Sequence, residues 1–214
     1  MTDLTLVRHG ETVWHADNRY TGSTDIALTE RGRQQADQLA SWAKQAHLDA
    51  IWVSPLERAR NTAAPCERAT GLTASVDKRL AELDFGAGEG LTSSEMLTQF
   101  PDARRAFEQD PVAGHLPDSE DPRHATERAV DCLKDIVHKH PSDRVLVVGH
   151  GTVKRLVLCH LLGIPLRHYR DMFPVVRNCG VTTIRWNGTG HAALIEYNTP
   201  IDFPAYDPGK DMTP

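Results

Sequence analysis

The sequence has no long hydrophobic run and no excess of positive charge. No apolar run approaches the roughly 20 residues that a membrane-spanning helix needs. The N-terminus MTDLTLVRHG also lacks the basic segment and long apolar stretch of a secretory signal. The formal net charge at pH 7 is -5, so the chain has no electrostatic footprint for nucleic acid. We therefore expect a cytoplasmic protein that binds neither membranes nor nucleic acid, and any positively charged site has to be local.

Cysteine is scarce and widely spaced. The chain has four cysteines and no C-x-x-C pair among them. They are Cys66, Cys132, Cys159 and Cys179. This spacing argues against a disulfide framework and against a cysteine zinc site. It fits a reducing compartment.

The length and the distribution of proline set the expected domain organisation. A chain of 214 residues can bury one sizeable core, and we predict a single domain over residues 1–197. The remaining stretch, residues 198–214, has four prolines and several acidic residues. Such a composition predicts a tail that lies across the surface or is disordered.

Strand patterns alternate with helix patterns along the chain. Short apolar strands are predicted at 4–8, at 50–53 and within RVLVVGHG, 144–151. Helices are predicted from Thr29, from Pro55 to Gly71, over 124–140 and from Thr152. Near the end, 180–186 and 191–197 flank the turn NGTG, which predicts a hairpin. This order predicts an α/β fold, a three-layer α/β/α sandwich with a mostly parallel central sheet.

Two of the predicted strands end in the same dipeptide. LTLVRHG ends in His9-Gly10, and VLVVGHG ends in His150-Gly151. Ligands of parallel α/β sheets bind beyond the carboxyl ends of the strands, so both histidines should reach the same edge. Arg8 precedes the first of them, and the planar guanidinium of arginine matches a phosphate. These residues predict a pocket for a phosphoryl group.

Four segments together resemble a known family. They are LVRHGETVW (6–14), SPLERARNTA (54–63), RLAELDFGAGEG (79–90) and VVGHG (147–151). Their order and spacing resemble the histidine phosphatase superfamily, which includes cofactor-dependent phosphoglycerate mutase, over roughly residues 4–197. The resemblance implies a phosphoglycerate mutase-like fold. It also implies catalytic roles for five residues: His9, Arg8, Arg58, Glu82 and His150.

The resemblance implies a reaction that needs no metal and no other cofactor. His9 would be the nucleophile that becomes phosphorylated, which splits one difficult displacement into two easier ones. Arg8, Arg58 and His150 would surround the phosphoryl oxygens, where the transition-state charge is spread. Glu82 would protonate the leaving oxygen and afterwards take a proton from the attacking water.

Other positions are expected to lie at or near the bound substrate. Thr21 and Gly22, in the segment NRYTG, and Gly151 are predicted to bind it, as the matching residues of the family do. His15 stands where many members have asparagine, and it is predicted either to contact phosphate or to pack. The segment 114–125 departs from the family pattern where relatives face the substrate. We expect a small anionic phosphorylated metabolite, which the sequence does not identify.

The sequence leaves several alternatives to weigh. Phosphatase is favoured over mutase because the segment after Glu82 is short, as in the phosphatase branch. A non-catalytic module that binds phosphorylated ligands would lack one of the five catalytic residues, and all are present. A metal hydrolase using His9, Glu82 and His150 conflicts with the adjacent arginines, which would repel a cation. Beyond the metabolite, the partner expected at most is a second copy in a homodimer.

The sequence also contains two chance motifs. Cys179 and Arg185 match the C-x5-R pattern of cysteine phosphatases, but the residues between them are strand-like and form no anion-binding loop. Asn187-Gly188-Thr189 matches a glycosylation acceptor and is better explained as the hairpin turn.

Overall fold

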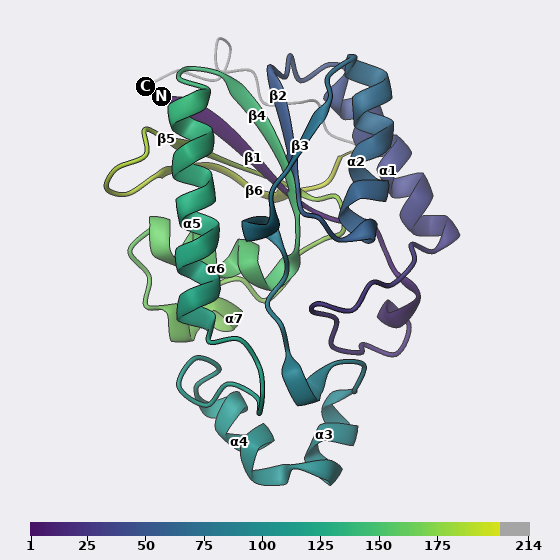
Figure 1. Cartoon of the computed structure of the whole chain (residues 1–214), viewed down its shortest axis with the longest axis vertical. Helices are drawn as coiled ribbons and strands as arrows, with labels where there is room; N and C mark the ends of the chain where they lie inside the picture. The colour runs from purple at the N-terminus through teal and green to yellow at the C-terminus, as the bar shows by residue number, and fades with distance from the viewer. Residues whose placement is uncertain (202–214) are drawn as a thin grey trace.

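A six-stranded sheet forms the centre of the molecule (Figure 1). The computed structural model describes residues 1–201, so most of the predicted tail, 198–214, lies outside the described residues. The strands are β1 (Thr2–Arg8), β2 (Ala50–Val53), β3 (Ala74–Val76), β4 (Arg144–Gly149), β5 (Val181–Trp186) and β6 (Ala193–Thr199). Their order across the sheet is β3-β2-β4-β1-β5-β6.

The sheet is mostly parallel, as the sequence predicted. β1, β4, β2 and β3 pair in parallel, whereas β5 pairs antiparallel to β1 and β6 pairs antiparallel to β5. The last two strands form the predicted hairpin around NGTG. β1 and β4 lie side by side in the middle, with Arg8 opposite Gly149 at their carboxyl ends.

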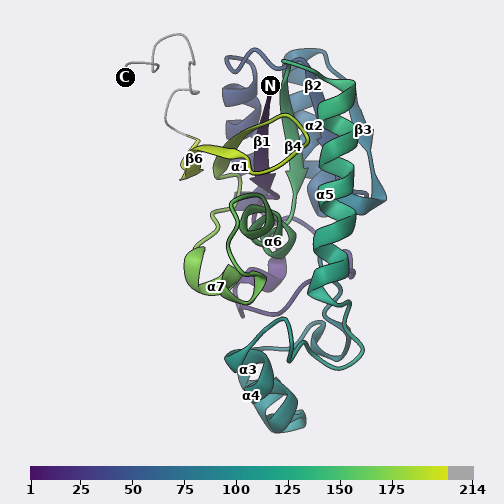
Figure 2. The ribbon, with the colours of Figure 1, turned by 90° about the vertical axis from the view of Figure 1, so that its left-hand side faces the viewer.

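Helices cover both faces of the sheet, which gives three layers (Figures 1 and 2). The longer helices are α1 (Glu30–Ala43), α2 (Glu57–Thr70), α5 (Pro122–Lys139) and α6 (Gly151–Leu161). Successive strand residues point to opposite layers, so Val7 and Val148 pack with α1 and α2, while Leu6 and Val147 pack with α5 and α6. The central strands are therefore apolar on both faces.

The helix ends agree with the sequence signals in most cases. Thr29 caps α1 by accepting a hydrogen bond from the Gly32 N–H, and Gly71 ends α2 at a φ of 75°. Pro55 was predicted in the first turn of α2, and this was wrong. The backbone of Leu56 is still extended, so α2 begins only at Glu57. The helix predicted over 124–140 begins earlier, at Pro122.

The segment between Glu82 and α5 contains structure that the sequence analysis did not predict. It forms α3 (Ser93–Gln99) and α4 (Pro101–Gln109), which lie at one end of the molecule, away from the sheet. The described chain has five further short elements, including the 3-10 helices η3 (Gly86–Gly88) and η4 (Leu166–His168). The other three bear on the site. These are α7 (Tyr169–Met172) and the 3-10 helices η1 (Val13–His15) and η2 (Lys78–Leu80).

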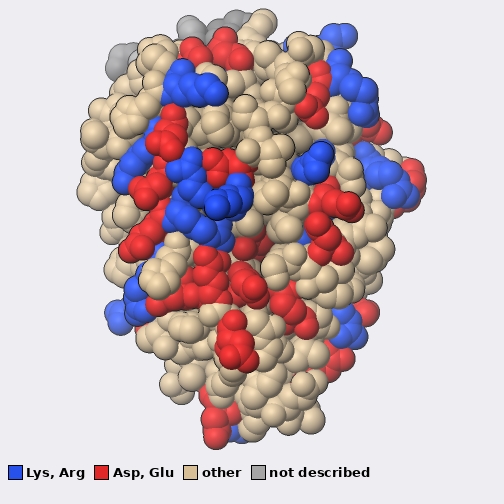
Figure 3. Space-filling model, in the orientation of Figure 1, with Lys and Arg blue, Asp and Glu red and all other residues tan. Residues whose placement is uncertain are grey.

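The charged surface and the helix lengths agree with the small net charge of the sequence and with its lack of long apolar runs. On the face shown in Figure 3, acidic and basic side chains are interspersed, and the basic ones form small separate groups. In residues 1–201, no helix is both long enough and apolar enough to cross a membrane.

Candidate active site

The predicted site residues meet at the carboxyl ends of β1 and β4. The backbone N–H of His9 donates to the Gly149 carbonyl at 3.0 Å, and the ring centroids of His9 and His150 are 5.3 Å apart. A pocket of about 480 Å³ opens beside them. Its wall includes six of the predicted residues: Arg8, His9, His15, Thr21, Glu82 and Gly151. The other three, Arg58, His150 and Gly22, are buried and are not part of this wall.

His9 is held in one tautomer by its neighbour. Its Nδ1 lies 2.7 Å from the Gly10 carbonyl oxygen, which can only accept, so Nδ1 carries the proton and Nε2 has a free lone pair. Burial, followed by the charges of Arg8 and Arg58, lowers the pKa of His9 well below its usual value. His9 is therefore a neutral imidazole with an unprotonated nitrogen available for attack.

Gly10 permits a close approach of two chain segments. A Cβ atom at this position would lie 2.5 Å from the carbonyl oxygen of Gly32, near the start of α1. Such a contact would force the backbone apart. The Gly10 N–H also donates to Thr62 Oγ1 on α2, which fixes the turn after β1.

His150 has one paired and one unpaired ring nitrogen. Its Nε2 lies 2.6 Å from Ser54 Oγ, and this hydroxyl already accepts from the Leu56 N–H. The opposite tautomer would leave both the Ser54 hydroxyl proton and Nδ1 without a hydrogen-bond partner among the described residues, so we infer that Ser54 donates to Nε2 and that Nδ1 carries the ring proton. Nδ1 is buried and has no hydrogen-bond partner among the described residues. A buried N–H without a partner is costly, and a phosphoryl oxygen would satisfy it.

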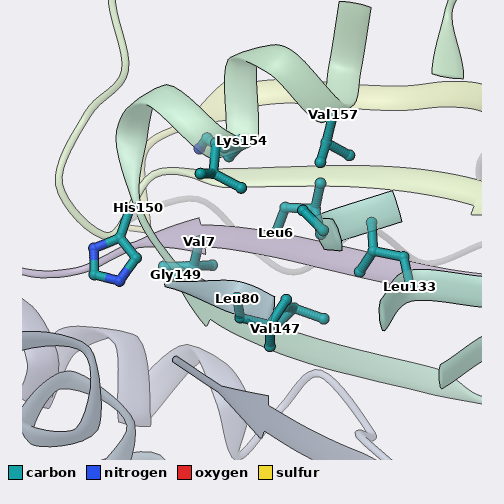
Figure 4. A pocket seen from close by; sticks show the side chains of 11 residues that line it. Leu6, Val7, Leu80, Leu133, Val147, Gly149, His150, Lys154 and Val157 are labelled. Atoms are coloured by element: carbon teal, nitrogen blue, oxygen red, sulfur yellow. The ribbon is translucent and has the colours of Figure 1, made fainter. Parts of the chain in front are cut away.

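The apolar space on the other side of His150 is too small for a ligand of this kind. Figure 4 shows the His150 ring turned away from side chains such as Leu6, Leu133 and Val147. They surround a cavity of about 30 Å³ between α6 and the sheet. Ligand sites are typically about ten times larger. This cavity is a packing gap, and the larger pocket is the candidate site.

Arg58 is fully buried in the first turn of α2. Its two terminal nitrogens donate to the carbonyls of Thr24 and Gly22 at 2.7 and 2.6 Å, whereas its buried Nε has no partner among the described residues. Gly22 thus positions Arg58 through its carbonyl. A Cβ atom at Gly22 would lie 2.3 Å from the Leu83 carbonyl oxygen, so only glycine fits there.

Arg8 is held from three sides. One terminal nitrogen donates to the Val176 carbonyl at 3.0 Å, and the other donates to His15 Nε2 at 2.8 Å. A Cβ atom at Gly151 would lie 3.3 Å from Arg8 Nε, so the lack of a side chain there lets Arg8 lie against the start of α6. Burial and then the Arg8 charge lower the pKa of His15 to about 4. His15 is thus a neutral acceptor in the pocket wall.

Glu82 has structural contacts that the sequence did not reveal. Its carboxylate accepts hydrogen bonds from the backbone N–H groups of Leu83, Thr152 and Val153 at 2.9 to 3.0 Å. Two of these donors belong to the first turn of α6, where a carboxylate is stabilising. Arg128 on α5 donates to the Glu82 carbonyl and so holds the loop that carries it.

The sequence analysis missed Ser54 and Asn178. Ser54 follows β2 directly, and this position at the carboxyl end of a parallel strand was a usable signal. Asn178 donates to the His9 carbonyl at 2.9 Å and lies 3.3 Å from His15 Nε2. It stands in a loop 169 residues away from His9, so no local pattern marks it.

The charges at the site suit an anion. In residues 1–201, no three His, Cys, Asp or Glu side chains are grouped so that they could hold a metal ion. Two guanidinium groups, Arg8 and Arg58, instead lie near His9 and His150. The arrangement can therefore bind a phosphoryl group and place a neutral imidazole next to it.

Comparisons with known proteins agree with this geometry. Residues 4–199 match the sequence model of the histidine phosphatase superfamily, branch 1. The chain is 32% identical over 169 residues to phosphoserine phosphatase 1 of Hydrogenobacter thermophilus, covering 79% of this chain and 80% of that one. It is also 32% identical over 184 residues to a probable phosphoglycerate mutase, GpmB, of Escherichia coli O1:K1, covering 86% and 85%. Among solved structures, Bacillus stearothermophilus YhfR superposes with a TM-score of 0.85 at 33% identity, covering 94% of this chain and all of that one.

Proposed function

We propose that this chain, which belongs to branch 1 of the histidine phosphatase superfamily, is a metal-independent phosphomonoesterase that acts through phosphorylation of His9. Members of the superfamily are phosphatases or mutases, and we propose that this chain is a phosphatase. The observation that carries it is the state of His9. Its Nδ1 proton is held by the Gly10 carbonyl, and its Nε2 is free beside Arg8, Arg58 and His150.

The proposed reaction has two displacements at phosphorus. His9 Nε2 forms a bond to phosphorus while the bond to the ester oxygen breaks, and Glu82, which enters this step protonated, gives its proton to that oxygen and becomes a carboxylate. Water then attacks the phosphohistidine and gives a proton to Glu82, and the phosphorus–nitrogen bond breaks. The products are an alcohol, inorganic phosphate and neutral His9.

The surrounding groups stabilise the charge that moves during both steps. Arg8 and Arg58 are fixed by carbonyls, and in this proposal their remaining N–H groups contact the phosphoryl oxygens. The His150 Nδ1–H, which has no protein partner in residues 1–201, donates to a third oxygen. His15 holds Arg8, while Thr21 and Gly151 are part of the pocket wall.

Phosphoglycerate mutase-type transfer is the second candidate. It is favoured by the segment NRYTG and by the similarity to a probable phosphoglycerate mutase. A mutase has to keep water away from the phosphohistidine while the substrate reorients. From the short segment between Glu82 and α5, only Phe85 and Ser93 are part of the pocket wall among the described residues. This small contribution favours hydrolysis.

Phosphate release from a panel of phosphomonoesters tests the proposal. We expect the purified protein to release inorganic phosphate from p-nitrophenyl phosphate and from phosphoglycerates. Excess EDTA should leave the rate unchanged, because arginines rather than cations neutralise the substrate. Loss of activity on chelation, restored by zinc or magnesium, would contradict it. Interconversion of 2- and 3-phosphoglycerate at a rate well above phosphate release would instead identify a mutase.

Ser54→Ala tests the assignment of the His150 tautomer. Without the hydroxyl, the His150 proton is free to move to Nε2, away from the phosphoryl group. We expect kcat/KM for p-nitrophenyl phosphate to fall about tenfold, which corresponds to one buried hydrogen bond of roughly 1.4 kcal/mol. Ser41→Ala, on the exposed face of α1, is the matched control and should leave kcat/KM unchanged. An unchanged rate in Ser54→Ala would show that this hydroxyl does not position His150.

A further inference from the structure

We infer that the substrate has a second acidic group, a carboxylate or another phosphate, and that Arg155 and Arg170 bind it in the pocket that also contains Arg8 and His9. The inference rests on the proposed function and adds the class of substrate. Both arginines are part of the wall of the same 480 Å³ pocket as Arg8 and His9. Neither belongs to the segments by which the family resemblance was identified.

Arg155 is fixed in place by the backbone. It stands in the second turn of α6, where its Nε donates to the Phe173 carbonyl at 2.7 Å and its Nη2 donates to the Pro174 carbonyl at 2.9 Å. Its Nη1 has no hydrogen-bond partner among residues 1–201. No carboxylate of the described chain lies within 4 Å of this guanidinium. Arg155 is therefore a cation held in a fixed position, and the N–H groups of its Nη1 are available to donate hydrogen bonds to a ligand.

Arg170 is held on an aromatic support. Its guanidinium carbon lies 5.9 Å from the ring centroid of Tyr20 and 5.2 Å from that of Phe107. Its Nη1 donates to the Tyr20 hydroxyl at 3.1 Å. The Tyr169 hydroxyl lies near Arg170 but has no hydrogen-bond partner among the described residues. These partners are uncharged, and no carboxylate among the described residues lies within 4 Å, so the Arg170 charge is not neutralised within this part of the chain.

The charges in the pocket leave Arg155 and Arg170 without a negatively charged partner. Arg19, also in the wall, pairs with Glu95 and Asp17 at 2.9 and 3.3 Å. Glu82, the one acid of the wall among the described residues, accepts from three backbone N–H groups and forms no ion pair with Arg155 or Arg170. Arg8 and Arg58 suffice for one phosphoryl group, because a phosphate monoester has at most two negative charges. Two further cations directed at the same pocket would repel each other and those of the phosphate site. A second acidic group on the substrate removes this repulsion.

The stacking of Arg170 has a competing explanation, which is that it only attaches α7 to α4 and to Tyr20. Arg104 makes similar contacts with Tyr20 and Phe107, but it pairs with Glu108 at 3.0 Å and is almost fully buried. Arg170 has no such acid and is exposed. The difference between these two arginines favours a ligand role for Arg170.

Matched pairs of esters test the inference. 3-Phosphoglycerate and glycerol 3-phosphate differ in a carboxylate, and fructose 1,6-bisphosphate and fructose 6-phosphate differ in a phosphate. We expect the wild-type enzyme to prefer the more acidic member of at least one pair by about 10- to 100-fold in kcat/KM, the effect of one or two hydrogen bonds between charged groups. The pair that shows the preference identifies the second group. In Arg155→Gln/Arg170→Gln, and more weakly in Arg170→Gln alone, the ratio should fall towards one.

The ratio within each variant cancels any loss of folded protein. Arg167→Gln, three residues from Arg170 and exposed, should keep the wild-type ratio, because Arg167 borders a neighbouring hollow that Arg170 also borders but is not part of the wall of the 480 Å³ pocket. Ratios close to one in both pairs for the wild-type enzyme would overturn the inference, and so would a wild-type preference that survives the double substitution. If none of the four esters and not even p-nitrophenyl phosphate releases phosphate, the proposed function fails, and this inference fails with it.

Discussion

His9→Ala is expected to abolish turnover of every phosphomonoester and to prevent trapping of label from a phosphorylated substrate. No other imidazole at the site combines a fixed Nδ1 proton with a free Nε2: His150 uses Nε2 to accept from Ser54, and His15 uses Nε2 to accept from Arg8. Loss of a covalent nucleophile costs on the order of 10⁵-fold or more in rate. Rapid quench into alkali with ³²P-labelled substrate, followed by peptide mapping at alkaline pH, measures the label directly, because the phosphorus–nitrogen bond of phosphohistidine is hydrolysed in acid.

Two further variants make the His9 experiment decisive. His9→Asn keeps a polar side chain of similar size, so its thermal unfolding shows whether the loss of activity reflects folding. His124→Ala replaces an exposed histidine on α5 and should keep full labelling and full turnover. Label that persists on His9→Ala would move the nucleophile to His150, whose ring centroid is only 5.3 Å away.

Glu82→Gln is expected to slow alkyl phosphates by about 10²- to 10⁴-fold and p-nitrophenyl phosphate much less. An alkyl alcohol leaves poorly unless it is protonated, whereas p-nitrophenolate is stable as an anion. The structure adds a second effect, because the carboxylate accepts three backbone N–H groups at the start of α6. The glutamine amide places an NH₂ group against one of these donors, which should cost about 1–3 kcal/mol of stability.

The two effects of Glu82 are separated by comparing substrates. A purely structural role would displace the start of α6 and slow both esters by the same factor, as Arg58→Ala should do by removing charge from the phosphoryl site. Asp84→Asn is the matched control: this nearby acid accepts from the Gly86 N–H and is not part of the pocket wall. If Asp84→Asn, rather than Glu82→Gln, shows the selective loss, Asp84 is the proton donor. Denaturant unfolding measures the stability cost independently.

The parts of the site that could be predicted from the sequence are those set by periodicity and by strand ends. Buried strands followed by His-Gly place His9 and His150 at one edge, since parallel strands share that edge. The helices α3 and α4 were not predicted, although Thr92 and Glu95 form a capping box and Pro101 stands in the first turn of α4. These signals were present and usable.

The remaining features depend on contacts that no local pattern contains. Asn178 reaches His9 from a loop near the end of the chain, and Arg170 meets Tyr20 across 150 residues. Glu82 accepts a hydrogen bond from the first turn of α6 although the two positions are 70 residues apart in the sequence. Each of these contacts depends on the order of the strands and on the path of the loops that lead back to the pocket. Such contacts can therefore be identified only in the folded structure.

The strand order has a consequence for how such an enzyme can change during evolution. His9 and His150 follow two neighbouring central strands, and core strands of this kind are generally among the last parts of a domain to open. Arg170 and Ser93 instead stand on α7 and α3, a four-residue and a seven-residue helix that have few partners in the core. Substitutions on these peripheral helices can change which leaving group is accepted without moving the nucleophile. Selection can thus act on specificity and on chemistry through different elements of one fold.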